Sequence, residues 1–171
     1  PVASTVPLFA AFRQLLALPG SRETAPALLD FLAQPDVARR LGLDADALAL
    51  LERALAEARA AWGLDPAARA ALGVPAIEEH TLAWAMDRLL ASLVHGNEDS
   101  DDLMSVAGKK LAPVTGVADA ALALGALDQL LQWLATLRED ATRPRSASAW
   151  AARLETAVDQ LFQAKPTDPD A

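Results

Sequence analysis

Apolar residues recur at helical spacing along nearly the whole chain, most clearly between residues 44 and 62. The stripe there consists of Leu48, Leu51, Leu55, Ala58 and Trp62. These positions step by three or four residues, which places them on one face of a helix. Asp44 suits the N-cap of that helix, and Gly63 suits its end. The pattern therefore predicts a helix over 44–62, with Trp62 as a core anchor that closes the stripe.

The same periodicity, interrupted by Gly and Pro, predicts helices on both sides of this one. They cover residues 7–18, 25–33, 36–41, 66–72, 79–94, 117–139 and 146–163. We expect Asp65 to cap the 66–72 helix, with Pro66 as its first residue, and Ser146 to cap the last helix. The resulting prediction is an all-α fold, an irregular bundle of about seven to eight helices.

Residues 96–116 form the longest stretch without helical periodicity, and we expect a functional or mobile loop there. No internal repeat or domain boundary divides the remainder. The sequence therefore predicts a single helical domain over 1–164, followed by a loose C-terminal tail over 165–171.

Composition supports helices over sheets. Alanine occurs 40 times and leucine 30 times among 171 residues, whereas there is one isoleucine and no tyrosine. Alanine and leucine favour helices, and the residues that favour strands are scarce. A hydrophobic content of 53% also excludes an intrinsically disordered chain.

The net charge and the absence of cysteine restrict the binding partners and the cellular compartment that we expect for this chain. The net charge of −8 opposes nucleic-acid binding by the chain as a whole. A local basic patch at the end of the 117–139 helix, formed by Arg138, Arg143 and Arg145, is the candidate for DNA or partner contact. Cations there also suit the helix dipole, an explanation that needs no DNA. The absence of cysteine excludes disulfides and thiolate zinc sites, and it fits the reducing conditions of the cytoplasm, where we expect the protein to act.

The sequence offers no sign of a membrane segment or a signal peptide. No run of 18 apolar residues is free of a charge or a helix breaker, so we expect no transmembrane helix. The first residues, PVASTVPLF, lack a basic region and an initiator Met. We interpret this start as that of a processed chain or of a segment from a longer protein.

Motifs for nucleotide and DNA chemistry are missing. The Gly108–Lys109 pair lacks the spacing and the preceding strand of a phosphate-binding loop. Many metal-dependent nucleases place a lysine two residues after an acid, but Ala107, Gly108 and Gln163 occupy that position for the three lysines.

Metal and hydrolase sites also lack a pattern. The acidic run of Glu98, Asp99, Asp101 and Asp102 does not fit the ligand spacing of a calcium loop, so we interpret it as a solvated loop. His80 and His95 are separated by about 22 Å along one predicted helix and cannot share a metal there. No nucleophilic cysteine or GxSxG turn is present. We therefore predict no catalytic, cofactor-binding or metal site in this segment.

Several segments, in order along the chain, resemble the RecC family, the gamma chain of exodeoxyribonuclease V. The matching landmarks are the LPGSR turn at 18–22, the P-V--R-GLD turn at 35–44, WGLD at 62–65, VP at 74–75, HT at 80–81, and the later Trp133 and Trp150. The chain departs from the family at Leu41 and Leu82, where the family has aromatic residues. It also carries LAPVTGV at 111–117 in place of the family's LPYDE loop, so no functional residue is transferred to that loop.

This resemblance implies a fragment of a much longer subunit, similar to the accessory 2B-type domain of superfamily 1 helicases. The parent complex would contain RecB-like and RecD-like chains, which would hold the ATP and Mg²⁺ sites, and would bind DNA during double-strand break repair and recombination. The segment itself would be a non-catalytic structural and interaction domain, monomeric when isolated and not bound to a membrane.

Two other hypotheses about the function of this protein remain open. One is a free-standing acidic helical adaptor or regulator, and the other is an enzyme whose site the motifs do not reveal. The length of the natural reading frame separates the first from a RecC-like fragment.

Overall fold

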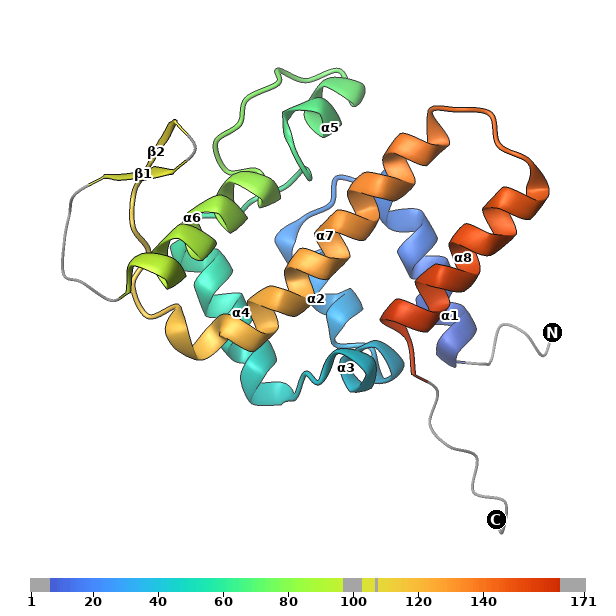
Figure 1. Ribbon diagram of the computed structural model, residues 1–171, viewed down its shortest axis with the longest axis horizontal. Helices are drawn as coiled ribbons and strands as arrows, with labels where there is room; N and C mark the ends of the chain where they lie inside the picture. The colour runs from blue at the N-terminus through green and yellow to red at the C-terminus, as the bar shows by residue number, and fades with distance from the viewer. Residues whose placement is uncertain (1–6, 97–102, 107, 164–171) are drawn as a thin grey trace, which may run out of the picture.

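The computed structural model describes residues 7–96, 103–106 and 108–163, and within these ranges the chain is almost entirely helical (Figure 1). The α-helices are α1 (Pro7–Ala17), α2 (Ala25–Leu32), α3 (Pro35–Leu41), α4 (Ala45–Glu57), α5 (Pro66–Ala71), α6 (Leu82–His95), α7 (Ala121–Ala141) and α8 (Ala147–Leu161). Two 3-10 helices, η2 (Leu18–Gly20) and η3 (Ala118–Ala120), precede α2 and α7. The predicted all-α class is confirmed.

The segment predicted as a loop over 96–116 contains a short β-hairpin. Strands β1 (Met104–Val106) and β2 (Lys109–Leu111) pair antiparallel, and Met104 lies opposite Leu111. These two side chains are buried with Ala91 of α6, so a small apolar contact holds the hairpin against that helix. The acidic run at 98–102 and the predicted tail at 165–171 lie outside the described residues.

Helix α7 is the central element of the core. It crosses the middle of the molecule in Figure 1 and packs against both α4 and α6. Its fully buried face consists of Leu124, Leu127, Leu130 and Leu134. Helix α8 returns beside α7 and ends near α1, where Phe162 packs edge-on against Phe12 and Phe31. The end of α8 therefore packs against α1, so the first and last helices of the bundle are in contact.

The apolar character of α7 is similar to that of a membrane-spanning segment. Residues 118–141 are long and apolar enough to cross a membrane by length and composition, with a mean hydropathy of 1.3, although 56% of that window is buried inside the fold. The central helix of a globular core has the same composition, because neighbouring helices cover its apolar face.

Helix starts agree with the capping residues in the sequence. The side chains of Asp44, Asp65 and Ser146 each accept a hydrogen bond from the backbone N–H three residues later. Thr24 and Thr81 cap α2 and α6 in the same way. Each cap satisfies an N–H that the helix itself leaves free.

The end of α4 differs from the prediction, and so does the role of Trp62. The helix stops at Glu57, and Arg59 takes a left-handed φ of 56°. Trp62 therefore lies in an extended segment, where it pairs with Thr24 and is half-buried. The prediction of Trp62 as a helical core anchor is wrong. Trp133 is the buried tryptophan, and its indole N–H donates to Gln160.

Candidate functional site

Three chain segments that carry the sequence landmarks meet in a backbone junction. The backbone N–H of Gly63 donates to the carbonyl of Arg22 at 2.9 Å, and that of Leu82 donates to the carbonyl of Gly63 at 3.0 Å. The N–H of Ala83 bonds to the carbonyl of Leu64 at 2.9 Å. We call residues 22–23, 61–64 and 80–83 the junction. It ties the starts of α2, α5 and α6 together.

Glu23 is the buried charge at the centre of the junction. Its side chain is 1% exposed, and its Oε2 accepts a hydrogen bond from the backbone N–H of Leu64 at 2.9 Å. Its Oε1 lies 2.9 Å from a guanidinium nitrogen of Arg138 on α7. Glu23 thereby links the turn after η2 to a helix 115 residues later. A buried carboxylate without such partners would be strongly unfavourable.

Arg69 fixes the loop between α5 and α6. Its buried guanidinium donates to the carbonyls of Ile77, Glu79 and Trp62, at 2.6, 2.9 and 3.0 Å. It also lies over the indole ring of Trp62, 4.8 Å from the ring centroid. Its planar group suits this arrangement, because it presents several donors in fixed directions.

Arg88 plays a corresponding part at the C-terminal end of α4. It donates to the carbonyls of Ala58 and Ala112 at 2.8 and 2.9 Å and lies over the ring of Trp84. Burial, and to a smaller extent the charge of Arg59, lowers the pKa of Arg88 from its usual value. These bonds hold the end of α4 and the segment after β2 against α6.

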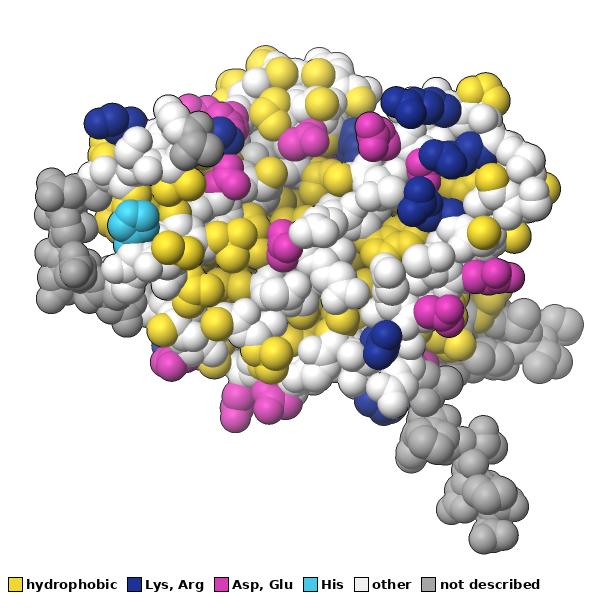
Figure 2. Space-filling view, viewed as in Figure 1, with side chains coloured by type: hydrophobic (Ala, Val, Ile, Leu, Met, Phe, Trp, Pro, Cys, Tyr) yellow, Lys and Arg dark blue, Asp and Glu magenta, His cyan; other side chains and the backbone are white. Residues whose placement is uncertain are grey.

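The structure places Arg138, Arg143 and Arg145 at one end of the α7–α8 hairpin. Figure 2 shows Lys and Arg side chains gathered over this end of the molecule. However, Arg138 bonds Glu23, and Arg145 and Arg153 both pair with the buried Asp140. Arg143 is exposed and has no ion-pair partner within the described ranges. Internal carboxylates therefore neutralise most of the predicted basic patch.

The remaining candidates from the sequence have structural contacts. Nδ1 of His80 lies 2.9 Å from the carbonyl oxygen of Arg59, and the ring packs against Trp84. Lys109 lies between Glu78 and Asp87, and its hydrogen bonds with both raise its pKa. Among the described residues, no group of three or more His, Asp or Glu side chains is placed to hold a metal ion.

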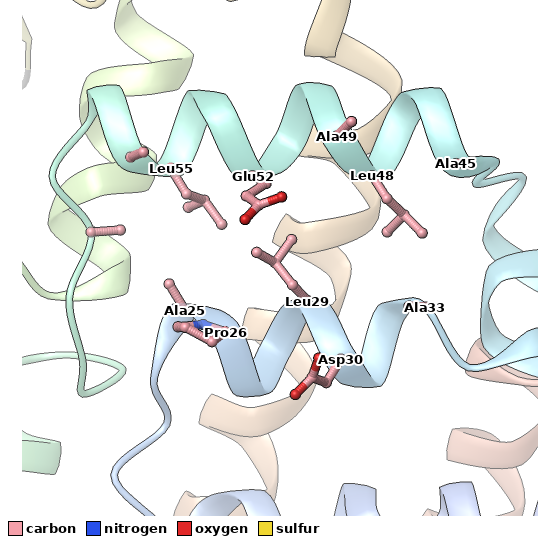
Figure 3. A pocket seen from close by; sticks show the side chains of 12 residues that line it. Ala25, Pro26, Leu29, Asp30, Ala33, Ala45, Leu48, Ala49, Glu52 and Leu55 are labelled. Carbon is pink, nitrogen blue, oxygen red and sulfur yellow. The ribbon is translucent and has the colours of Figure 1, made fainter.

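A surface hollow lies between α2 and α4, and the sequence motifs do not predict it. Its volume is about 580 Å³. Alanine and leucine side chains form most of its walls, and Figure 3 shows Glu52 projecting between the two helices. We call this hollow the α2–α4 groove. The sequence holds a weak sign of it, since alanines repeat along α4 beside the buried stripe.

The buried charges Glu23, Arg69 and Arg88 were also missed. The available sign is a charged residue among apolar neighbours, as at Arg69 between Ala68 and Ala70. In the structure, all three side chains bond to this chain's own backbone. The junction thus stabilises the fold. The exposed α2–α4 groove is the candidate surface at which this domain contacts a partner.

These features define an all-helical domain held together by buried charges. A family model described as the RecBCD enzyme subunit RecC fourth domain matches residues 5–171, and the chain belongs to this family. It is 26% identical over 161 residues to the RecBCD enzyme subunit RecC of Mycobacterium tuberculosis, and 29% identical over 171 residues to that of Mycolicibacterium smegmatis. The alignments cover 94% and 99% of this chain but 14% and 15% of those relatives. The chain therefore spans about a seventh of the length of these proteins.

Proposed function

We propose that this domain is a non-catalytic scaffold within a RecC-type subunit. In this proposal the subunit joins RecB-like and RecD-like chains in a helicase–nuclease complex that acts on DNA ends in the cytoplasm during break repair and recombination. ATP and Mg²⁺ would act in those other chains. The family match over residues 5–171 is the observation that carries the proposal.

The use of the charged side chains supports a scaffold role. The guanidinium groups of Arg69 and Arg88 bind backbone carbonyls, and the carboxylate of Glu23 binds a backbone N–H. Catalytic groups, in contrast, face a cleft where they can reach a substrate. The charges of this domain serve to fix its loops and helix ends.

The test is a set of assays on the 171-residue chain, after circular dichroism has verified its helical content. We expect no ATP hydrolysis and no Mg²⁺-dependent DNA cleavage. Fluorescence anisotropy with labelled single- and double-stranded oligonucleotides should show no binding tighter than about 10⁻⁴ M at physiological salt, because the net charge of −8 repels phosphate.

A double variant makes this test specific to the predicted patch. Micromolar DNA binding that is lost on Arg143→Ala plus Arg145→Ala, but kept on Arg13→Ala plus Arg53→Ala, would replace the scaffold by a DNA-contacting module. Arg13 and Arg53 are exposed arginines on α1 and α4, so the control removes equal charge elsewhere.

A further inference from the structure

We propose that the α2–α4 groove docks an amphipathic helix that carries basic residues and belongs to a part of the RecC-type chain outside residues 1–171. This inference rests on the proposed function, since it assigns the scaffold an internal partner. The groove is suited to a helix by its shape, its lining and its charge.

The walls of the groove are apolar and mostly small. Leu29 and Leu48 extend into the space between the helices in Figure 3, while Ala33, Ala49 and Ala56 leave room beside them. Small side chains allow the backbone of a neighbouring helix to come close. Leucines between them supply apolar area that remains partly exposed in this structure.

The length of the walls also fits a helix. Helix α4 has 13 residues and α2 has 8, which correspond to about 20 and 12 Å, so the two walls together can accommodate about two turns of a partner. Apolar anchors at every third or fourth position of an amphipathic helix would meet the leucines in turn. A small polar ligand would find few donors here, because the walls are mainly methyl groups.

The charged side chains that line the groove indicate the charge of the docked helix. Glu52 projects into the groove from α4, and Asp30 of α2 lines its edge. No lysine or arginine lines the groove, and neither carboxylate has an ion-pair partner among the residues described. Lysine or arginine side chains on the docked helix would form ion pairs with these two carboxylates, whereas an acidic side chain on that helix would be repelled.

Covalent linkage favours a segment of the same subunit. This chain aligns with 14–15% of its relatives, so most of a RecC-type subunit lies elsewhere in the polypeptide. A linked segment meets the groove at an effective concentration that reaches the millimolar range for a short flexible linker. A groove of this size can therefore be occupied by a segment with modest intrinsic affinity.

Thiol footprinting of the full-length RecC-type subunit tests the proposal. Ala49→Cys places a thiol in the groove, and Ala151→Cys places a control thiol on an exposed position of α8. The rate of modification by N-ethylmaleimide is read at each peptide by mass spectrometry. We expect modification at position 49 to be at least tenfold slower than at position 151 in the free subunit.

A charge reversal then tests the identity of the contact. Glu52→Arg should restore rapid modification at position 49, whereas Glu155→Arg, an exposed acid on α8, should leave the protection intact. Both side chains are exposed, and an unchanged melting temperature verifies that each variant folds.

Three outcomes would overturn the inference. Equal modification rates at the two positions would mean an open groove. Protection that appears only after RecB-like and RecD-like chains are added would assign the groove to another subunit, and protection that increases with subunit concentration would assign it to a second copy. If the two modification rates are equal but the complex still requires this domain for its assembly, the proposed function stands and only the docking inference is wrong.

Discussion

At the residue scale, Glu23 links distant parts of the chain. It is almost completely buried, yet both carboxylate oxygens are bonded, one to a backbone N–H and one to Arg138. Such a group stabilises the fold only while both partners remain, because a buried charge that loses a partner is unfavourable by several kcal/mol.

Glu23→Gln tests this role. The substitution keeps an acceptor for the N–H of Leu64 but removes the charge that faces Arg138, so we expect a loss of about 2 kcal/mol in the free energy of unfolding. Urea unfolding monitored by circular dichroism measures it. The control is Glu139→Gln on the exposed side of α7, which should remain within about 0.5 kcal/mol of the parent chain. Equal effects of the two variants would contradict the role given to Glu23.

The same residue shows where sequence reasoning stops. The sequence predicts Arg138 as a candidate for DNA or partner contact, because it lies at a helix end near other arginines. Its carboxylate partner lies 115 positions away, and no local pattern indicates that pairing. The ion pairs of Asp140 with Arg145 and Arg153 are closer in sequence, but they depend on how the turn between α7 and α8 folds back.

At the element scale, helix starts could be predicted and one important helix end could not. Asp44, Asp65 and Ser146 act locally, through their own side chains, so the sequence was sufficient to find them. The alanine-rich segment after Glu57 has high helix propensity, and Gly63 made a plausible end. Instead, Arg88 binds the carbonyl of Ala58, and the His80 ring contacts that of Arg59. Tertiary contacts, which local propensity does not include, thus end α4 early.

Two glycines with positive φ allow a test of the junction's packing. Gly42 ends α3 with a φ of 68° and has nothing near its missing Cβ, whereas a Cβ at Gly63, with a φ of 78°, would lie 3.0 Å from Cγ of Arg69. We expect Gly42→Ala to cost about 1 kcal/mol from backbone strain alone. Gly63→Ala should cost about 1–3 kcal/mol more, because it also displaces Arg69. Equal shifts in the urea midpoints of the two variants would show that the Arg69 side chain moves aside without a loss of stability.

The β-hairpin should show a pH dependence through Lys109. Its hydrogen bonds to Glu78 and Asp87 raise its pKa, so the folded state holds this proton more tightly than the unfolded state. The stabilisation is therefore complete below pH 10.5, the usual pKa, and is lost as the pH rises through the raised value. Because the pair is exposed, the effect should be small.

Comparison of Lys109→Met with the parent chain measures this contribution. The difference in the free energy of unfolding should be constant from neutral pH to about 10 and should shrink towards zero at higher pH. Lys110→Met is the control, since Lys110 is exposed and has no ion pair in the described part of the chain. A constant difference across the alkaline range would argue against the Lys109 contacts.

At the scale of the whole molecule, the first and last thirds of the chain are tied together. Glu23 meets Arg138, and the backbone N–H of Gln163 donates to the carbonyl of Asp36 at 2.9 Å. We therefore expect a single unfolding transition. Tryptophan fluorescence and far-ultraviolet circular dichroism should give coincident urea curves, because the four tryptophans are spread over the chain. Separate midpoints would indicate that α8 or the β-hairpin unfolds independently.

The contact between Phe12 of α1 and Phe162 after α8 also determines how this domain would respond to mechanical force. Their ring centroids lie 6.3 Å apart, so α1 and the end of α8 lie side by side. Tension transmitted along the subunit would pull directly on this aromatic contact and on the bonds from α3 to the end of α8. Phe162 also packs against Phe31 of α2, so the same tension would reach one wall of the α2–α4 groove. The groove would keep its shape until these aromatic contacts separate.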